Sequence, residues 1–403
     1  MKILQVCKKF PHPAKDGESI AVTSLGRALH HSGCKLSLLA MNTAKHPFRG
    51  RNLPDALNFY DDVGMVDVDN RLRVWDAFLN LFSRDSYHIS RFESQGFARR
   101  LQRVLREREY DIIQLETLFL VPYIPLIRKE TGAPIALRAH NVEYEIWDRI
   151  SQNAVSGPRK WYLQYLTKKL KRFEKASIGT CDVLLPITEK DLQTFQRLGY
   201  RGRAQVIPIG INTEEYRPDY SVFDRPPSMG FIGSLDWMPN REGLDWFLDS
   251  IWPRLLTSFP ELRLHVAGRN TPASLRDSKR AGLVIHGEVP DARAFINQHS
   301  LLLVPLLSGS GMRVKILEAM ALGKVVITTR LGLEGIEARD GRELMVADTA
   351  SEFASKLQLF HRQGAQMRAM GQRARQFVET RYHSREIASR LRELYSSFTV
   401  GAL

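Results

Sequence analysis

The chain of 403 residues suits two domains of about 200 residues each, and its 43% hydrophobic and 25% charged residues are ordinary for a globular enzyme. A formal net charge of +14 implies an acidic partner, such as a phosphorylated substrate, an anionic membrane surface or nucleic acid. No apolar run approaches the roughly 18 residues that span a bilayer, and three scattered cysteines argue against a zinc site or a disulfide framework. We therefore expect a protein of the reducing cytoplasm.

The first half of the chain alternates between predicted strands and helices. The first apolar run, ILQVC, is too short for a signal peptide and is interpreted as a strand. Strands are predicted at 2–7, 35–41, 111–116, 134–139, 181–187 and 204–210, and helices near 19–32 and at 188–199. This alternation predicts an α/β domain with a doubly wound parallel sheet.

The second half repeats the pattern after a proline-containing segment at 212–228, which we interpret as a linker. Strands are predicted at 229–234, 262–268, 283–289, 301–307 and 325–328, with a helix around 240–258 and a helical C-terminus. We predict two Rossmann-like domains, residues 1–211 and 229–379, that face each other across a cleft, with a helix at about 380–398 that packs back on the first.

The most informative segment is SGSGMRVKILEAMALGK, residues 308–324, which lies between two apolar runs. It predicts a βαβ unit in which a Gly/Ser loop leads into a helix. The N-terminus of a helix favours an anion, yet Arg313 and Lys315 place two cations there. A phosphate or diphosphate would account for both facts, whereas the alternative is a surface ion network that includes Glu318. Because Glu318 interrupts an apolar helix, we expect it to have a polar partner.

Several longer segments occur in the order found in one enzyme family. They are HNVEYE (140–145), FEKASIGTCDVLLPITEKD (173–191), VIPIGINTEEYRP (206–218), FIGSLDWMPNREGLDWF (231–247) and GSGMRVKILEAMALGKVVITT (309–329). Together they resemble a retaining glycosyltransferase of family 4 with the GT-B fold, and most closely the sugar transferases of bacterial exopolysaccharide or surface polysaccharide assembly. The resemblance covers essentially the whole chain. It implies that the C-terminal domain binds a nucleotide-sugar donor and the N-terminal domain an acceptor.

The resemblance also implies the residues that bind the donor. The family has a Glu-x7-Glu pattern whose second glutamate binds the ribose hydroxyls, and Glu318 occupies that place. The first glutamate, which contacts the transferred sugar in the family, falls on Ser310, which offers only a hydroxyl. The amides of Gly311 and Met312 are expected to meet the phosphates.

Many relatives place an Arg and a Lys after the first strand of the C-terminal domain, where they neutralise the diphosphate. This chain has Ser234 at the place of the Arg, and Arg241 lies near the place of the Lys. We expect Arg313 and Lys315 to have taken over that charge, with Arg241 as a partial substitute. Gly233, which ends the strand, would allow the donor to approach the backbone closely.

Two positions in the N-terminal half also match the family. His140 follows the predicted strand 134–139 and in the family lies near the donor sugar; the alternative is a histidine that is exposed or has a structural partner. Glu143 would hydrogen-bond nearby or cap the next helix. Gly17 belongs to a loop that resembles the glycine loop facing the acceptor and the donor diphosphate.

Sugar transfer from a nucleotide diphosphate requires that the charge of the departing phosphate be stabilised. Because lysine and arginine can supply that stabilisation, we expect no divalent metal and no cofactor beyond a UDP- or GDP-sugar donor. Retention of anomeric configuration, by attack on the same face, is implied by the family.

Two basic amphipathic stretches, 159–175 and 75–92, suit an anionic membrane surface and a lipid-linked acceptor such as an undecaprenyl-diphosphate saccharide. Such contact would place the protein at the inner face of the cytoplasmic membrane. An ordinary surface helix with one buried face is the alternative, and for 159–175 it is the favoured one.

Three other functions would each fit part of the sequence. A nucleic-acid-binding protein fits the charge, but basic and aromatic residues follow no known recognition pattern, so we expect no nucleic-acid partner. An NAD-linked oxidoreductase would need a GxGxxG turn after the first strand, where KKFPHPAKDGES stands instead. An epimerase or phosphorylase of GT-B shape remains an alternative, although no pyridoxal lysine site is evident.

Overall fold

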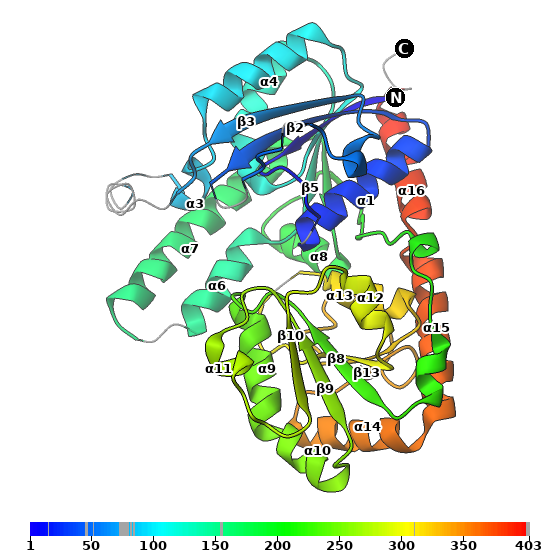
Figure 1. Cartoon of the computed structure of the whole chain (residues 1–403). Coiled ribbons are helices and arrows are strands. Elements are labelled where there is room, and N and C mark those ends of the chain that lie inside the picture. Colours follow the sequence, from blue (N-terminus) through cyan, green and yellow to red (C-terminus); the bar gives the residue numbers. More distant parts are fainter. Residues whose placement is uncertain are drawn as a thin grey trace. The chain divides into compact units, whose positions relative to one another are not determined.

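The computed structural model describes residues 1–14, 16–44, 47–50, 52–71, 80, 83, 85–153, 156–309 and 311–399. The chain divides into two compact units, Met1–Gly210 with Ser384–Leu403, and Ile211–His383 (Figure 1). Each unit contains one parallel sheet with helices, which confirms the predicted α/β class with two Rossmann-like sheets. The segment 212–228, interpreted above as a linker, belongs to the second unit.

The first unit is built on a seven-stranded sheet in the order β3-β2-β1-β4-β5-β6-β7. Its strands are β1 (Lys2–Cys7), β2 (Lys35–Thr43), β3 (Asp62–Val68), β4 (Ile112–Leu115), β5 (Ile135–Ala139), β6 (Val183–Pro186) and β7 (Arg203–Ala204). All neighbours pair in parallel. The strand order reverses between β1 and β4, and ligands of doubly wound sheets bind beyond the carboxyl ends of the strands at such a point.

Helices cover both faces of this sheet. They are α1 (Gly17–His31), α3 (Tyr87–Ser90), α4 (Gln95–Glu107), α5 (Ile124–Glu130), α6 (Glu143–Asn153), α7 (Pro158–Ser177), α8 (Glu189–Arg197) and α16 (Ser384–Thr399). Ile3 and Ile112 share a core with residues of α1 and α16, whereas Leu4 and Ile113 share the opposite core with residues of α4, α5 and α7. Helix α16, at the end of the chain, therefore completes the first unit beside α1 (Figure 1).

The second unit is built on a six-stranded parallel sheet in the order β10-β9-β8-β11-β12-β13. Its strands are β8 (Ser228–Ile232), β9 (Arg263–Ala267), β10 (Leu283–Gly287), β11 (Leu301–Val304), β12 (Val325–Thr328) and β13 (Met345–Val346). Its helices are α9 (Met238–Ser250), α10 (Trp252–Ser258), α11 (Ala273–Arg276), α12 (Ala292–Asn297), α13 (Val314–Ala321), α14 (Ala350–Arg362) and α15 (Gly364–Arg381). Here the strand order reverses between β8 and β11.

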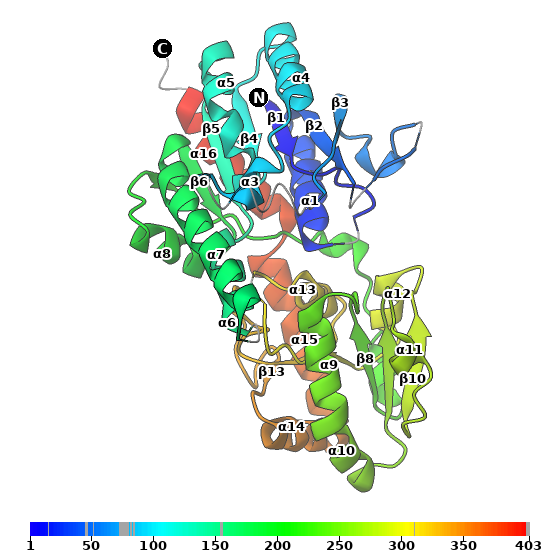
Figure 2. The ribbon, with the colours of Figure 1, turned by 90° about the vertical axis from the view of Figure 1, so that its left-hand side faces the viewer.

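Helix α9 runs lengthwise along this sheet (Figure 2). It approaches the end of β11 so closely that a Cβ atom on Gly243 would lie 1.9 Å from the carbonyl oxygen of Pro305. Only glycine allows this contact between helix and backbone. The first turns of α9 are thereby held against the loop that leads from β11 to α13.

Prolines account for two differences from the sequence prediction. The strand expected at 204–210 is regular only over Arg203–Ala204, although Ile207, which precedes a proline, still donates its N–H to the carbonyl of β6 residue Pro186 at 2.8 Å. The helix expected around 240–258 is divided into α9 and α10, because a proline near the start of α10 cannot continue the hydrogen-bond ladder of α9. No helix in the described parts of the chain is long and apolar enough to cross a bilayer.

Candidate active site

Lys315 lies in the first turn of α13 and reaches the carboxyl end of β8. Its Nζ donates to the carbonyl oxygen of Ile232 at 3.2 Å and to Oδ1 of Asn240 at 3.0 Å, and lies 5.2 Å from the ring centre of Phe231. Burial, and then the nearby Arg313, lower the pKa of Lys315 to about 7. Among the described residues, no carboxylate lies within ion-pair distance of this lysine. The amine is therefore held by neutral acceptors in a site that suits an added anion.

Asn240 on α9 is a site residue that the sequence did not indicate. Its Nδ2 donates to the carbonyl of Ser234 at 2.9 Å, while its Oδ1 accepts from Lys315. A Cβ atom on Gly233 would lie 2.7 Å from Asn240 Nδ2. Gly233, predicted from its place at the strand end, is thus needed for the side chain of Asn240 to approach the end of β8.

Arg313 is the N-cap residue of α13. Its guanidinium contacts the loop that precedes the helix. Its Nη1 donates to the carbonyl of Gly311 at 2.5 Å, and a Cβ atom on Gly309 would lie 3.1 Å from its Nη2. Gly311 and Gly309 both have positive φ angles, +82° and +104°. Met312 is buried. Ser310 lies outside the described residues, so its predicted part in the site stays a prediction.

Glu318 lies one turn beyond Lys315 on α13. Its Oε1 accepts a hydrogen bond from the hydroxyl of Tyr216 at 3.0 Å, which confirms the expected polar partner. Burial raises the pKa of Glu318 and also that of Tyr216. The guanidinium of Arg293 lies 5.5 Å from the Tyr216 ring. The alternative of a surface ion network with Lys315 does not hold, because Glu318 contacts a tyrosine instead.

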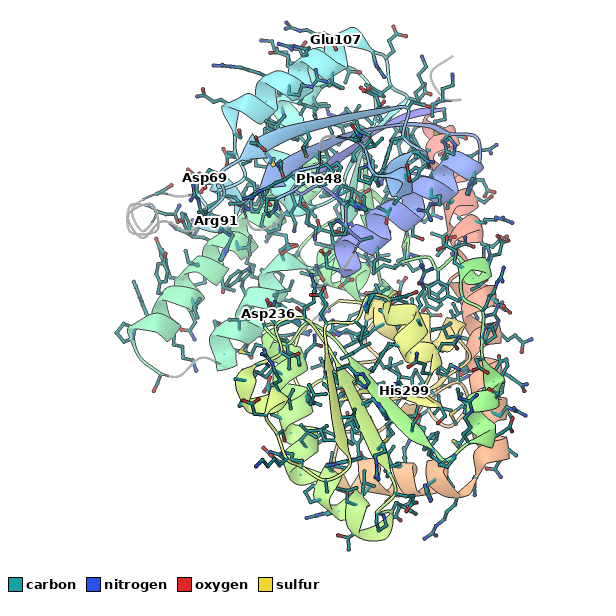
Figure 3. The ribbon with its side chains drawn as sticks, in the orientation of Figure 1. Phe48, Asp69, Arg91, Glu107, Asp236 and His299 are labelled. Atoms are coloured by element: carbon teal, nitrogen blue, oxygen red, sulfur yellow. The ribbon has the colours of Figure 1, made fainter. Side chains whose placement is uncertain are left out.

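The other residues expected near the donor phosphates face elsewhere. The Arg241 side chain lies on the exposed side of α9, with its Nε 3.4 Å from Asp245 Oδ2, so the structure does not bring it to Lys315. Ser234 donates to Asp236 Oδ1 at 2.5 Å, and this bond lowers the pKa of Asp236, which is labelled in Figure 3. Arg313 and Lys315 are the two predicted cations that the structure places together.

In the first unit, His140 follows β5 and contacts a buried carboxylate. Its Nε2 lies 2.9 Å from Oε2 of Glu116, which follows β4. The other oxygen of Glu116 accepts from the side-chain amides of Gln5 and Gln114, and Arg138 Nη1 lies 3.5 Å from Oε2. Burial alone would raise the pKa of Glu116, but Arg138 and His140 hold it at about 2. Burial lowers the pKa of His140 despite this carboxylate.

A second group of charges lies between β1 and the N-terminal ends of α1 and α6. Lys8 Nζ lies 3.2 Å from Glu18 Oε2 and 4.2 Å from the ring centre of Phe119. Burial opposes the charge of Glu18, but Lys8 lowers the pKa of that carboxyl below its ordinary value. Gly17 begins α1 directly after Asp16, which caps the helix. The predicted approach of the donor diphosphate to Gly17 stays a prediction.

Helix α6 is capped by a residue from α7. Glu174 accepts hydrogen bonds from the backbone N–H groups of Glu143 and Tyr144, each at 2.9 Å. The cap that Glu143 was predicted to supply is thus supplied by Glu174. Burial raises the pKa of Glu143, although the nearby charge of Lys8 acts to lower it. Glu143 therefore belongs to the charged group around β1.

Across the described ranges, no group of three or more His, Cys, Asp or Glu side chains could hold a metal ion.

Two family models match consecutive parts of the chain. "Glycosyltransferase Family 4" matches residues 16–215, and "Glycosyl transferases group 1" matches residues 226–362. The fold and the site thus define a glycosyltransferase with the GT-B fold. Because the two matches together span most of both units, the chain belongs to the family 4 glycosyltransferases.

Individual proteins are similar at lower identity. An uncharacterized 44.6 kDa protein in the cps region of Klebsiella pneumoniae is 22% identical over 305 residues, which cover 72% of this chain and 75% of that protein. Sucrose-phosphate synthase from Thermosynechococcus elongatus has a similar fold, with a TM-score of 0.73 at 15% identity over 100% of both chains. Anabaena HepE in complex with UDP-glucose gives a TM-score of 0.67 at 13% identity, over 98% of this chain and 100% of that one.

Proposed function

We propose that this glycosyltransferase moves a sugar, with retention, from a nucleotide-diphosphate sugar to a saccharide or lipid-linked saccharide during assembly of a bacterial exopolysaccharide or surface polysaccharide. The observation that carries the proposal is the pair of basic side chains at the start of α13, where Lys315 reaches the end of β8 and Arg313 lies near enough to lower the pKa of Lys315. The Klebsiella relative in a cps region supports the pathway, and HepE with UDP-glucose supports a UDP-sugar over its GDP counterpart.

The chemistry follows from these contacts. During transfer the bond between the anomeric carbon and the diphosphate oxygen breaks, and negative charge develops on the leaving group. Lys315 and Arg313, with the amides of Gly311 and Met312, would stabilise that charge. The acceptor hydroxyl attacks on the same face, and its proton passes to the departing phosphate. Because two cations carry the charge, we propose that no divalent metal is required.

Glu318 would bind the ribose hydroxyls of the donor. Its carboxyl is half-buried and already accepts a hydroxyl hydrogen from Tyr216 at 3.0 Å. A ribose hydroxyl offers the same chemistry as a tyrosine hydroxyl, so the group that contacts Glu318 in the free protein mimics the expected ligand. Arg293 beside Tyr216 would steady this arrangement.

Thermal-shift titrations with UDP-, GDP- and ADP-glucose, with and without EDTA, test the proposal. The donor nucleotide should raise the melting temperature in proportion to the logarithm of its concentration, because only the folded protein binds it. Lys315→Met should abolish that shift, whereas Lys279→Met, which removes an exposed lysine of the same unit, should preserve it. An unchanged shift in Lys315→Met would contradict the proposed diphosphate site, and a shift abolished by EDTA would contradict metal independence.

We also propose that α7 contacts an anionic membrane that carries the acceptor. Trp161 is 62% exposed and stacks on Tyr165 with ring centres 5.8 Å apart, while Lys168 and Lys171 are exposed on the same helix. An exposed aromatic pair beside lysines suits the boundary between headgroups and acyl chains. Of the other basic stretch, 75–92, residues 75–79, 81, 82 and 84 lie outside the described residues, so its predicted membrane contact stays a prediction.

Flotation with phosphatidylglycerol vesicles at low salt tests membrane contact. The protein should float with these vesicles and not with phosphatidylcholine alone, and Trp161→Ala should reduce the bound fraction several-fold. Absence of the wild-type protein from the anionic vesicle fraction would overturn this part of the proposal without affecting the donor site.

A further inference from the structure

A layer of polar side chains lies inside the apolar core between the first sheet and the helices α1 and α16. Gln5 of β1 pairs in register with Gln114 of β4, and Glu116 and Arg138 lie on the same face. Glu116 and Arg138 are both 0% exposed. Burying charges is costly unless they are paired and hydrogen-bonded. Packing alone therefore does not explain why these polar side chains lie in the core.

The outer members of this layer fix the orientation of the inner amides. The hydroxyl of Tyr60 donates to Gln5 Oε1 at 2.6 Å, and the hydroxyl of Tyr395 donates to Gln114 Oε1 at 2.7 Å. Each amide oxygen is thus occupied, and each NH2 group faces the same oxygen, Oε1 of Glu116. A protonated Oε1 could donate to only one of two amides, whereas an ionised one accepts from both. The two amides therefore keep the proton off Oε1, and the Arg138 guanidinium, 3.5 Å from Oε2, keeps it off Oε2 because a positive charge there favours the ionised carboxylate.

The protonation of His140 follows from that of Glu116. An ionised carboxylate can only accept, so the hydrogen between Glu116 Oε2 and His140 Nε2 must belong to the histidine. Other charges near the ring are Arg138, which disfavours the imidazolium, and Glu18, which favours it. Burial lowers the pKa of His140 more than the two carboxylates raise it, so the ring is neutral at pH 7. In a neutral ring with its proton on Nε2, Nδ1 is the acceptor.

We propose that Glu116 is a positioning residue that fixes His140 in the tautomer with the proton on Nε2, so that Nδ1 can accept a hydrogen bond from a sugar hydroxyl in the transfer reaction. The second part rests on the proposed function, whereas the tautomer is a property of the free protein. Arg138 keeps Glu116 ionised, and the two glutamines hold its other oxygen.

The substitution Glu116→Gln gives a specific prediction, because the amides of Gln5 and Gln114 would select the carbonyl oxygen of the new side chain. Its NH2 group would then face His140 Nε2, which must become an acceptor. The ring would change to the tautomer with the proton on Nδ1. The side chain keeps its size, so the geometry is preserved while the direction of one hydrogen bond is reversed.

Nitrogen-15 NMR of the histidine rings in the full-length protein at pH 7.5 measures this directly, with the signals of His140 assigned by their loss in His140→Gln. The wild-type protein should show a neutral ring protonated on Nε2, and Glu116→Gln should show the Nδ1-protonated form. A wild-type ring that is charged or protonated on Nδ1 would overturn the proposal, as would an unchanged tautomer in folded Glu116→Gln.

Activity supplies a second readout. Sugar transfer by Glu116→Gln should fall about a hundredfold or more in kcat, the scale of one proton-handling group, with the KM for the donor nearly unchanged. The structural control is Tyr123→Phe, which removes a buried hydroxyl that donates to the Phe92 carbonyl at 2.7 Å elsewhere in the same unit. It should retain activity. If Glu116→Gln keeps the kcat of the wild type, the positioning role of Glu116 is overturned. Donor binding by the second unit can be intact in that case, so the positioning role and the proposed donor site can fail separately.

Discussion

The side-chain amide oxygen of Asn240 accepts a hydrogen bond from Lys315 Nζ at 3.0 Å, which joins the first turn of α9 to the first turn of α13. The partner is neutral, so it orients the amine without cancelling its charge. Because the same amide also donates to the backbone of Ser234, the position of Lys315 is tied to the end of β8. The proposed donor site therefore depends on three separate elements of the second unit.

Proton uptake should accompany nucleotide binding. The pKa of Lys315 is lowered to about 7, so at pH 8 most of these side chains are unprotonated in the free protein. A bound diphosphate raises that pKa, and the protein should take up nearly one proton. Calorimetry of UDP binding at pH 8 in buffers of different ionisation enthalpy measures this uptake. Lys315→Met should show none, and affinity in the wild type should decline as pH rises above 7.

Replacing Asn240 by aspartate should weaken binding of the nucleotide. A carboxylate 3.0 Å from Lys315 Nζ would form an ion pair and repel the diphosphate. We expect UDP to bind at least about tenfold more weakly, which corresponds to roughly 1.4 kcal/mol. The exposed substitution Asp245→Asn, in the same helix, should leave affinity unchanged. Equal affinities in the wild type and Asn240→Asp would show that the diphosphate lies elsewhere.

Gly243→Ala should disturb the proposed donor site through packing alone. The added methyl group would meet the Pro305 carbonyl oxygen at 1.9 Å, so α9 must move away from the β11 end. Overpacking of this kind costs about 1–3 kcal/mol of unfolding free energy. Urea denaturation should detect the loss, and UDP affinity should fall because α9 carries Asn240. Gly179→Ala is the matched control, since nothing lies within 4 Å of its Cβ position.

Removing the Glu116 carboxylate should destabilise the protein strongly. Glu116→Ala leaves the fully buried Arg138 uncompensated, and losing one partner of such a pair costs about 3–5 kcal/mol. In the wild type, the pKa of Glu116 is lowered to about 2 from its ordinary value of 4.5, so its stabilising contribution is present above pH 4.5 and is lost as pH falls toward 2. Urea midpoints between pH 5 and pH 2.5 should decline less in Glu116→Ala than in the wild type.

The sequence predicted most of the sheet because buried parallel strands form continuous apolar runs. It did not indicate β3 (DVGMVDV), since this edge strand alternates with polar residues and contains Gly64. It placed Arg241 near the phosphates because it could not establish the phase of α9. Asn240 faces Lys315 and Gly243 faces Pro305, whereas Arg241 points toward Asp245 on the exposed side.

The buried polar layer left a signal in the sequence that the predictions did not use. ILQVC and IALRA each carry one polar residue in an apolar run, and IIQLE carries two, at positions that the parallel register brings together. Gln5 and Gln114 are direct partners in that register. The hydroxyl of Tyr395, which covers this layer, could not be predicted, because 281 positions of the sequence separate Tyr395 from Gln114.

The place of α16 has a consequence for biosynthesis. Ile387, Leu391 and Tyr395 belong to the core of the first unit, yet the ribosome makes them after the whole second unit. During synthesis, the polar layer of the N-terminal sheet therefore stays uncovered by α16 until these last residues leave the ribosome. An early stop codon upstream of Ser384 would therefore leave the N-terminal half without its seal, even though most of that half had long been synthesised.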